Sequence, residues 1–111
     1  MSLKLIKLQR VVEEFRKLDP EMQAQTMLAF MFVAEKQESG TPTTVKEVGE
    51  YLEVTSASAS RNIAALSKVS RHRRPGHDLI FTYENPEYRV EKLIELTDKG
   101  KLLVKRLEGL L

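Results

Sequence analysis

The side chains best suited to chemistry lie between Thr55 and His77, where basic and hydroxyl residues replace acidic ones. This stretch contains no acid and five bases, namely Arg61, Lys68, Arg71, Arg73 and Arg74. Residues 13–53 instead contain nine acids and four bases, a net charge of −5. Serine hydroxyls bond phosphates or base edges, and arginine pairs bidentately with guanine or phosphate. The segregation favours a surface for polyanions, and a solvated basic loop without a partner is the alternative.

Other kinds of chemistry find little support among the 111 residues. The chain has no Cys and only two His, which excludes disulfides, Cys nucleophiles and thiolate metal sites. His72 and His77 are candidates for a metal ligand or a pH switch, but a solvent-exposed or phosphate-side role is favoured. Helix capping and a solvated face explain Glu47 and Glu50 without catalysis. We find no Ser/His/Asp pattern and no glycine-rich phosphate loop, so we expect no enzyme, no metal and no cofactor.

Apolar spacing and turn residues predict an α+β fold that is mainly α-helical with one small β-hairpin. Helices are expected over 3–18, about 20–37, 45–52, 55–69 and 98–109, and strands over 79–84 and 88–96. Thr44 and Glu47 fit a capping box, in which the two side chains satisfy opposite backbone amides. The other expected N-caps are Asp19, Thr55 and Thr97.

The order of these elements makes the helix at 55–69 a candidate recognition helix. Two short helices joined by a tight turn form a helix-turn-helix, and the hairpin that follows them is a wing. The second helix of such a unit enters the major groove. The wing approaches the adjacent minor groove, whose negative potential attracts arginine. The predicted DNA contacts are Thr55, Ser56, Ala57, Ser58, Ser60, Arg61, Lys68, Arg71, Arg73, Arg74 and Arg89.

Three stretches in this order resemble the MarR family of winged helix-turn-helix regulators. They are residues 55–61 (TSASASR), residues 84–89 (ENPEYR) with Leu93, and residues 96–103 (LTDKGKLL). They match the family's recognition helix, its wing and the Leu-Thr-x-x-Gly segment that leaves the wing. The resemblance, over about residues 25–107, implies a dimeric, duplex-DNA-binding transcription regulator, usually a repressor of prokaryotic or phage origin. It carries Ser60 and Arg61 over as DNA contacts and Arg89 as the wing arginine.

The sequence departs from the family's pattern in three places. Residues 69–78 form a longer and more basic link between recognition helix and wing. The wing has the single Arg89 where the family usually carries two or more arginines beside an aspartate. The C-terminal helix is short, and the chain shows no further terminal helix, which bears on the dimer geometry and on any small-molecule pocket.

Both terminal helices carry more apolar side chains than a core of this size readily covers. They are Leu5, Leu8, Val12, Phe15, Leu103, Leu107, Leu110 and Leu111. Exposed apolar stripes usually mark an interface, so we predict a symmetric homodimer through residues 1–19 and 98–111. Residues 20–97 would form the DNA-binding core, with the wing over 79–96, all within one domain of residues 1–111. The dimer would present two recognition helices about 34–36 Å apart to a pseudo-palindromic site.

Two classes of function follow from the sequence. The first is a sequence-specific duplex-DNA-binding transcription regulator, acting as a homodimeric repressor. The second is a winged-helix assembly module that binds proteins without touching DNA. A core role is favoured for Met27, Phe30, Met31 and Phe32, and whether a small-molecule effector binds is left open. No apolar run approaches the ~20 residues of a membrane span and no signal-peptide pattern is present, so we expect a cytoplasmic protein without membrane contacts.

Overall fold

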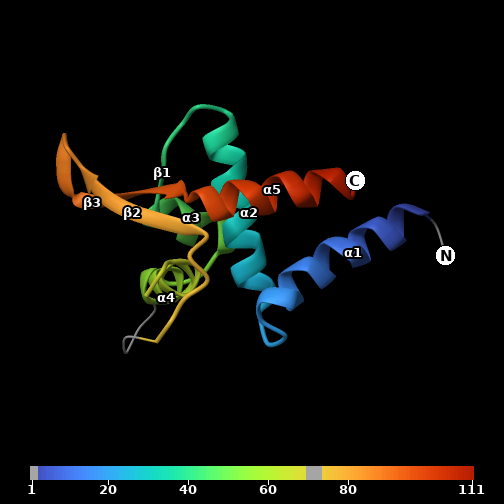
Figure 1. The fold of residues 1–111 in the computed structure, drawn as a ribbon. Helices are drawn as coiled ribbons and strands as arrows, with labels where there is room; N and C mark the ends of the chain where they lie inside the picture. Colours follow the sequence, from blue (N-terminus) through green and yellow to red (C-terminus); the bar gives the residue numbers. More distant parts are fainter. Residues whose placement is uncertain (1–2, 70–73) are drawn as a thin grey trace.

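A computed structural model describes residues 3–69 and 74–111. The elements are α1 (Leu3–Leu18), α2 (Ala24–Glu38), β1 (Thr43–Thr44), α3 (Val45–Leu52), α4 (Ser56–Leu66), β2 (Ile80–Asn85), β3 (Tyr88–Leu96) and α5 (Asp98–Gly109). The predicted α+β fold, a mainly helical chain with a hairpin wing, is confirmed. In Figure 1 the wing projects at one end of the molecule, and α1 and α5 extend side by side toward the other.

Three threonines start the helices that were expected to begin there. Each threonine hydroxyl accepts a hydrogen bond from the backbone N–H of the residue three positions later in the chain. The distances are 3.1 Å at Thr44, 3.1 Å at Thr55 and 3.0 Å at Thr97. The second half of the predicted capping box is wrong. The Glu47 carboxylate accepts from the Thr44 hydroxyl at 3.3 Å instead of capping a backbone amide. Thr44 belongs to β1 and is paired with Leu93 across the sheet.

The second helix begins later than the sequence suggested. It starts at Ala24, and its N-cap Gln23 makes no side-chain capping bond. Asp19 was expected to be the cap, but its carboxylate accepts the N–H of Glu21 at 2.9 Å and closes a turn. A local bond from an Asp to the residue two positions on competes with helix capping. The turn leaves Met22 outside the helix and buried at 9% exposure.

The sheet has one strand more than the predicted hairpin. Its order is β1-β3-β2, with antiparallel pairing throughout. Thr43 lies opposite Ile94, and Ile80 lies opposite Leu96. A two-residue strand such as Thr43–Thr44 has too few positions to show an alternating pattern, so the sequence carries no signal for it.

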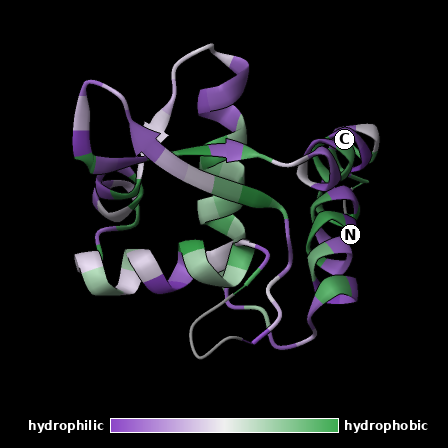
Figure 2. Cartoon of the chain, turned by 60° about the vertical axis from the view of Figure 1, so that its left-hand side comes forward, coloured by the Kyte–Doolittle hydropathy of each residue, from purple (hydrophilic) through white to green (hydrophobic). Residues whose placement is uncertain are grey.

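The core lies where α2 crosses the other elements. Phe30 is fully buried and meets Phe15 of α1 edge to face, with ring centroids 5.8 Å apart. The remaining largest buried side chains are Val33, Val48, Leu66, Leu79, Ile80 and Ile94. They come from α2, α3, α4, the strands and the segment before β2, so this core fixes α4 against the rest of the fold. Figure 2 shows the apolar sides of the helices turned toward this interior.

Candidate nucleic-acid interface

The N-terminal half of α4 has one side exposed to solvent and the opposite side packed against the core. Thr55 caps the first turn through the N–H of Ser58, which is itself half-buried. Ala59 and Ile63 on the opposite side are buried. The exposed residues of this half are Thr55, Ser56, Ala57, Ser60 and Arg61. Five of the predicted contacts therefore share one open surface, where small side chains leave room for a close approach.

A close contact between α3 and α4 sets up the helix-turn-helix. Glu53 ends α3 in the left-handed region, with φ +57°. A Cβ placed on Gly49 would lie 3.3 Å from the Cβ of Ala59, so glycine lets the two helices approach closely. The tight turn then leads directly to Thr55. The two helices pack as brace and presented helix, as predicted for this motif.

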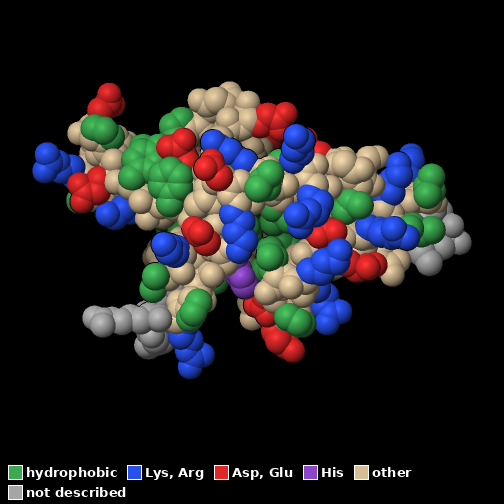
Figure 3. Space-filling view, viewed as in Figure 1, with side chains coloured by type: hydrophobic (Ala, Val, Ile, Leu, Met, Phe, Trp, Pro, Cys, Tyr) green, Lys and Arg blue, Asp and Glu red, His purple; other side chains and the backbone are tan. Residues whose placement is uncertain are grey.

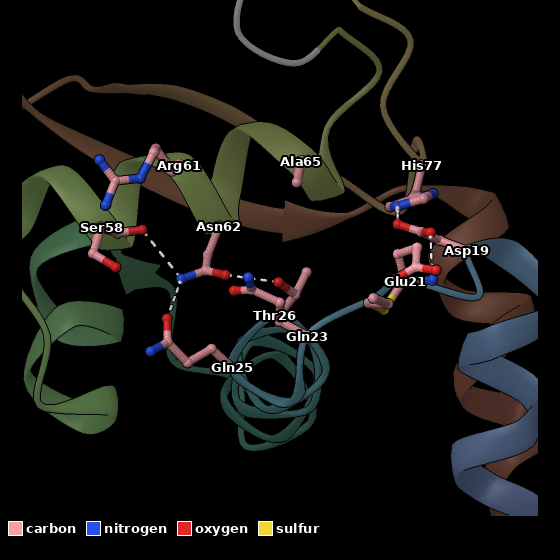
Figure 4. A pocket seen from close by; sticks show the side chains of 11 residues that line it. Asp19, Glu21, Gln23, Gln25, Thr26, Ser58, Arg61, Asn62, Ala65 and His77 are labelled. Atoms are coloured by element: carbon pink, nitrogen blue, oxygen red, sulfur yellow. Dashed lines mark hydrogen bonds and ion pairs between the residues drawn. The ribbon is translucent and has the colours of Figure 1, made fainter.

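A buried polar residue that the sequence reasoning missed fixes α4 on α2. Asn62 is 6% exposed, and its amide oxygen accepts from the Thr26 hydroxyl at 2.7 Å. Its amide nitrogen donates to the Gln25 side chain and to the Ser58 carbonyl, both at 3.1 Å. Figure 4 shows these bonds converging below the exposed face of α4. The signal was a polar residue on the same side of the helix as Ala59 and Ile63.

The chain turns back along the C-terminal end of α4 through residues 76–79. α4 ends at Leu66, before the predicted Val69, because the returning segment takes up its last carbonyls. His77, Asp78 and Leu79 donate their N–H groups to Ala65, Ser67 and Leu66 at 3.0, 3.2 and 2.8 Å. A Cβ on Gly76 would collide with the Ser67 carbonyl oxygen, so this return requires glycine.

The basic residues between α4 and β2 fall partly inside the described chain. Lys68 and Arg74 are exposed. Arg71 and Arg73 lie outside the described residues, as does His72, so the phosphate contacts predicted for the two arginines stay predictions. Lys68 and Arg74 flank the returning segment, next to the C-terminal end of α4.

The wing places Arg89 near its tip. The turn between β2 and β3 is closed by Asn85, whose side chain accepts the Glu87 N–H at 3.0 Å and donates to Glu91 at 2.8 Å. Arg89 is exposed on β3, two residues beyond Glu87. In the middle of β2, a hydrogen bond to Glu95 raises the pKa of Tyr83. The expected wing arginine is therefore accessible.

A polar hollow of about 370 Å³ lies beside α4. Arg61 and Asn62 line it from α4, and Asp19 and His77 line it from the two neighbouring loops. His77 Nε2 lies 3.6 Å from an Asp19 carboxylate oxygen. Figure 4 shows this pair bridging the α1–α2 turn and the segment before β2. The contact joins the C-terminal end of α1 to the segment that follows α4.

The terminal helices divide the predicted dimer residues into two groups. Phe15, Leu103 and Leu107 are buried within the single chain at 0, 5 and 6% exposure, so they are core residues and not an open stripe. The expectation for these three is corrected, because α1 and α5 turn them toward α2. Leu110 is half-buried. The exposed members are Leu5, Leu8, Val12 and Leu111.

The described residues form neither a cluster of metal ligands nor a helix that could span a membrane. No group of three or more His, Asp or Glu among residues 3–69 and 74–111 is arranged to hold a metal ion. No helix in the same ranges is long and apolar enough to cross a bilayer.

Comparison with known proteins gives structural neighbours and no sequence relatives. No protein-family model matches the chain, and no curated protein matches it significantly. The S. aureus MepR–DNA complex is similar at a TM-score of 0.71 and 18% identity, over 96% of this chain and 74% of that one. RV1404 from Mycobacterium tuberculosis is similar at 0.70 and 17%, over 96% and 64%.

A MarR-like transcriptional regulator from Thermotoga maritima is a third neighbour. Its TM-score is 0.62 at 22% identity, over 98% of this chain and 74% of that one. The chain thus spans between about two thirds and three quarters of the length of these neighbours. The agreement over nearly the whole chain shows that it has the winged-helix fold of MarR-like regulators, as the resemblance predicted.

Proposed function

We propose that this protein is a transcription regulator that binds duplex DNA sequence-specifically. α4 enters the major groove, where Ser56, Ser60 and Arg61 read base edges. Lys68 and Arg74, together with Arg71 and Arg73, hold phosphates beside it. Arg89 reaches the adjacent minor groove from the wing. The protein works in the cytoplasm of a prokaryote or a phage-infected cell.

One observation carries the proposal: the capped N-terminal half of α4 exposes only small, hydroxyl or basic side chains. Thr55 to Arg61 contain no acid and no large apolar residue. A helix of that kind can approach a groove without repulsion or desolvation of apolar surface. A structural neighbour, MepR, has been solved in complex with DNA. Together the surface and the fold favour DNA over a protein partner.

We further propose that the regulator is a homodimer and a repressor. The exposed side chains Leu5, Leu8, Val12 and Leu111 supply an apolar surface on the terminal helices. Pairing them across a two-fold axis would set two α4 helices against successive major grooves. Occupation of such a site over a promoter would block transcription by occlusion. The operator would be pseudo-palindromic.

The test is fluorescence anisotropy of a labelled random-sequence duplex titrated with protein at several salt concentrations. We expect the logarithm of the affinity to fall linearly with the logarithm of salt concentration, because bound phosphates release counterions. Arg61→Ala with Arg74→Ala should weaken binding at least about tenfold and lower the slope by about 0.9, because Arg74 is the phosphate contact of this pair and Arg61 contacts bases. Lys36→Ala with Lys46→Ala removes the same charge away from α4 and should leave binding unchanged.

Two results would contradict the proposal. If the wild-type protein fails to bind any duplex at low salt, the fold serves another purpose, and a protein-assembly module becomes the better account. If both double variants weaken binding equally, net charge and not the α4 surface determines the affinity. Selection of a preferred sequence from a random pool is the next step once binding is established.

A further inference from the structure

The surface of α1 is divided into three faces around the helix axis. The buried face holds Val11, Phe15 and the half-buried Leu18. The apolar row consists of Leu5, Leu8 and Val12, with 53, 56 and 39% exposure. The charged row consists of Lys7, Arg10, Glu14 and Lys17. Residues three and four apart share a helix face, and at 3.6 residues per turn the two exposed rows lie on opposite sides of α1.

α5 lies against the charged row and adds to it. Its Arg106 is 3.7 Å from the carboxylate of Glu14, and Lys7 donates to the Leu111 carbonyl at 3.0 Å. Arg106 and Lys99, seven residues apart, share one face of α5. We call the set Lys7, Arg10, Lys17, Lys99 and Arg106 the α1–α5 basic face. Figure 3 shows basic side chains gathered over α1 and α5 in this view.

The charge on these two helices is large and poorly compensated. α1 and α5 together contain nine bases and four acids, a net charge of +5, whereas residues 19–53 carry −5. Glu14 is the acid within the charged row, and its side chain is 11% exposed. Both Lys17 and Arg106 contact it, at 3.0 and 3.7 Å, so its charge is already neutralised. Of the other cations of the face, Arg10 and Lys99 are exposed and Lys7 is half-buried, and like charges one turn apart repel.

We propose that the α1–α5 basic face binds the phosphate backbone of duplex DNA, as a second contact surface separate from α4. The row from Lys7 to Lys17 is straight and about 15 Å long at 1.5 Å per residue. That length corresponds to about four phosphates of one strand when measured along the duplex axis, at about 3.4 Å of axis each. Lys7, Arg10 and Lys17, held on one face of a rigid helix with Glu14 already paired, suit a regular polyanion better than an irregular acidic protein surface.

Two features connect this face with the proposed function, on which the inference rests. Lys99 donates to the His77 carbonyl at 2.9 Å, so the face begins at the segment that carries Arg74 beyond α4. The apolar row lies on the other side of α1, so a homodimer formed through that row leaves the basic face open. The regulator therefore has a path for DNA that extends beyond its recognition helix.

The experiment combines variants of the two surfaces. Arg10→Gln with Arg106→Gln removes two cations from the face, and Lys36→Gln with Lys46→Gln is the matched control. Each pair is made in the wild-type chain and in the Arg61→Ala, Arg74→Ala chain. Binding to a random duplex is measured by anisotropy across a salt series, and folding of every variant is checked by circular dichroism and thermal melting.

We expect the face variant to lower the salt slope by about 1.8, since two phosphate contacts are lost, and the control to leave it unchanged. The Arg61→Ala, Arg74→Ala chain should keep weak, salt-dependent duplex binding, and adding the face variant should lower the slope of that binding by about 1.8 again. If Arg61→Ala with Arg74→Ala alone removes all binding, the face proposal is overturned and the α4 proposal stands. If only the face variant matters, the α4 proposal fails instead.

A different partner would also overturn the proposal. The same proteins are therefore mixed with vesicles of phosphatidylcholine and phosphatidylserine. Attachment of the wild type to these vesicles that is lost in the Arg10→Gln, Arg106→Gln variant, without any change in duplex binding, would assign the face to a membrane surface. Folded variants with wild-type duplex affinity and slope would remove DNA as the partner whatever the vesicles show.

Discussion

At the scale of single residues, the threonine caps could be predicted from the sequence, whereas the turn at Asp19 and the buried amide of Asn62 could not. A threonine before a helix satisfies an amide within its own first turn, so Thr55 and Thr97 are visible from local sequence. The bond between Asn62 and Thr26 joins residues 36 positions apart. It exists only because α2 and α4 pack together, and a sequence does not state that packing.

The Asn62 network should contribute measurably to stability. Asn62→Ala leaves the buried Thr26 hydroxyl without its acceptor, and the desolvation of such a group costs about 1–3 kcal/mol. We expect the free energy of unfolding, measured by urea denaturation, to fall by that amount. Ser60→Ala on the exposed side of the same helix should change it by less than about 0.5 kcal/mol. Equal stability of the two variants would mean that the amide bonds do not anchor α4.

At the scale of elements, predictions succeeded where the deciding interactions are local. Helix α5 has the expected bounds of 98–109, because Thr97 caps it and the apolar side chains recur at helical spacing. α2 and α4 differ at one end each, because Met22 and the segment 76–79 make tertiary contacts there. β1 was missed, since its two residues gain strand character only by pairing with β3.

Two glycines of α5 provide a test of how that helix is seated. A Cβ on Gly100 would collide with the Leu79 carbonyl oxygen, whereas Gly109 has nothing within 4 Å of the same position. We expect Gly100→Ala to lower the free energy of unfolding by about 1–3 kcal/mol, because overpacking forces the backbone to shift. Gly109→Ala should be neutral or stabilising by up to about 1 kcal/mol. Thermal melting of both variants decides it, and a stable Gly100→Ala protein would place α5 farther from Leu79.

At the scale of the whole molecule, the terminal helices contribute side chains both to the core and to the exposed surface. The principal extents are 48 × 32 × 27 Å, and α1 and α5 form one end of the long axis. Eight of their apolar residues were assigned to an interface from the sequence, Phe15, Leu103 and Leu107 among them. Phe15, Leu103 and Leu107 are buried in the core of the single chain. The apolar surface available to a partner therefore consists of the exposed side chains, chiefly the apolar row of α1.

The apolar row of α1 is where the dimer can be tested most directly. Leu8 is 56% exposed and lies at the centre of the row, so Leu8→Glu puts a charge into the proposed interface without disturbing the core. Burying an unpaired charge is strongly unfavourable, and we expect light scattering to give a single-chain mass at micromolar concentration where the wild type gives two. Gln9→Glu adds the same charge to a neighbouring exposed position outside the row and should leave the dimer intact. Affinity for a selected pseudo-palindromic duplex should fall with Leu8→Glu alone, because one recognition helix then binds without its partner. A wild-type protein that scatters as a single chain, or a Leu8→Glu protein that remains a dimer, would show that the apolar row is not the dimer surface.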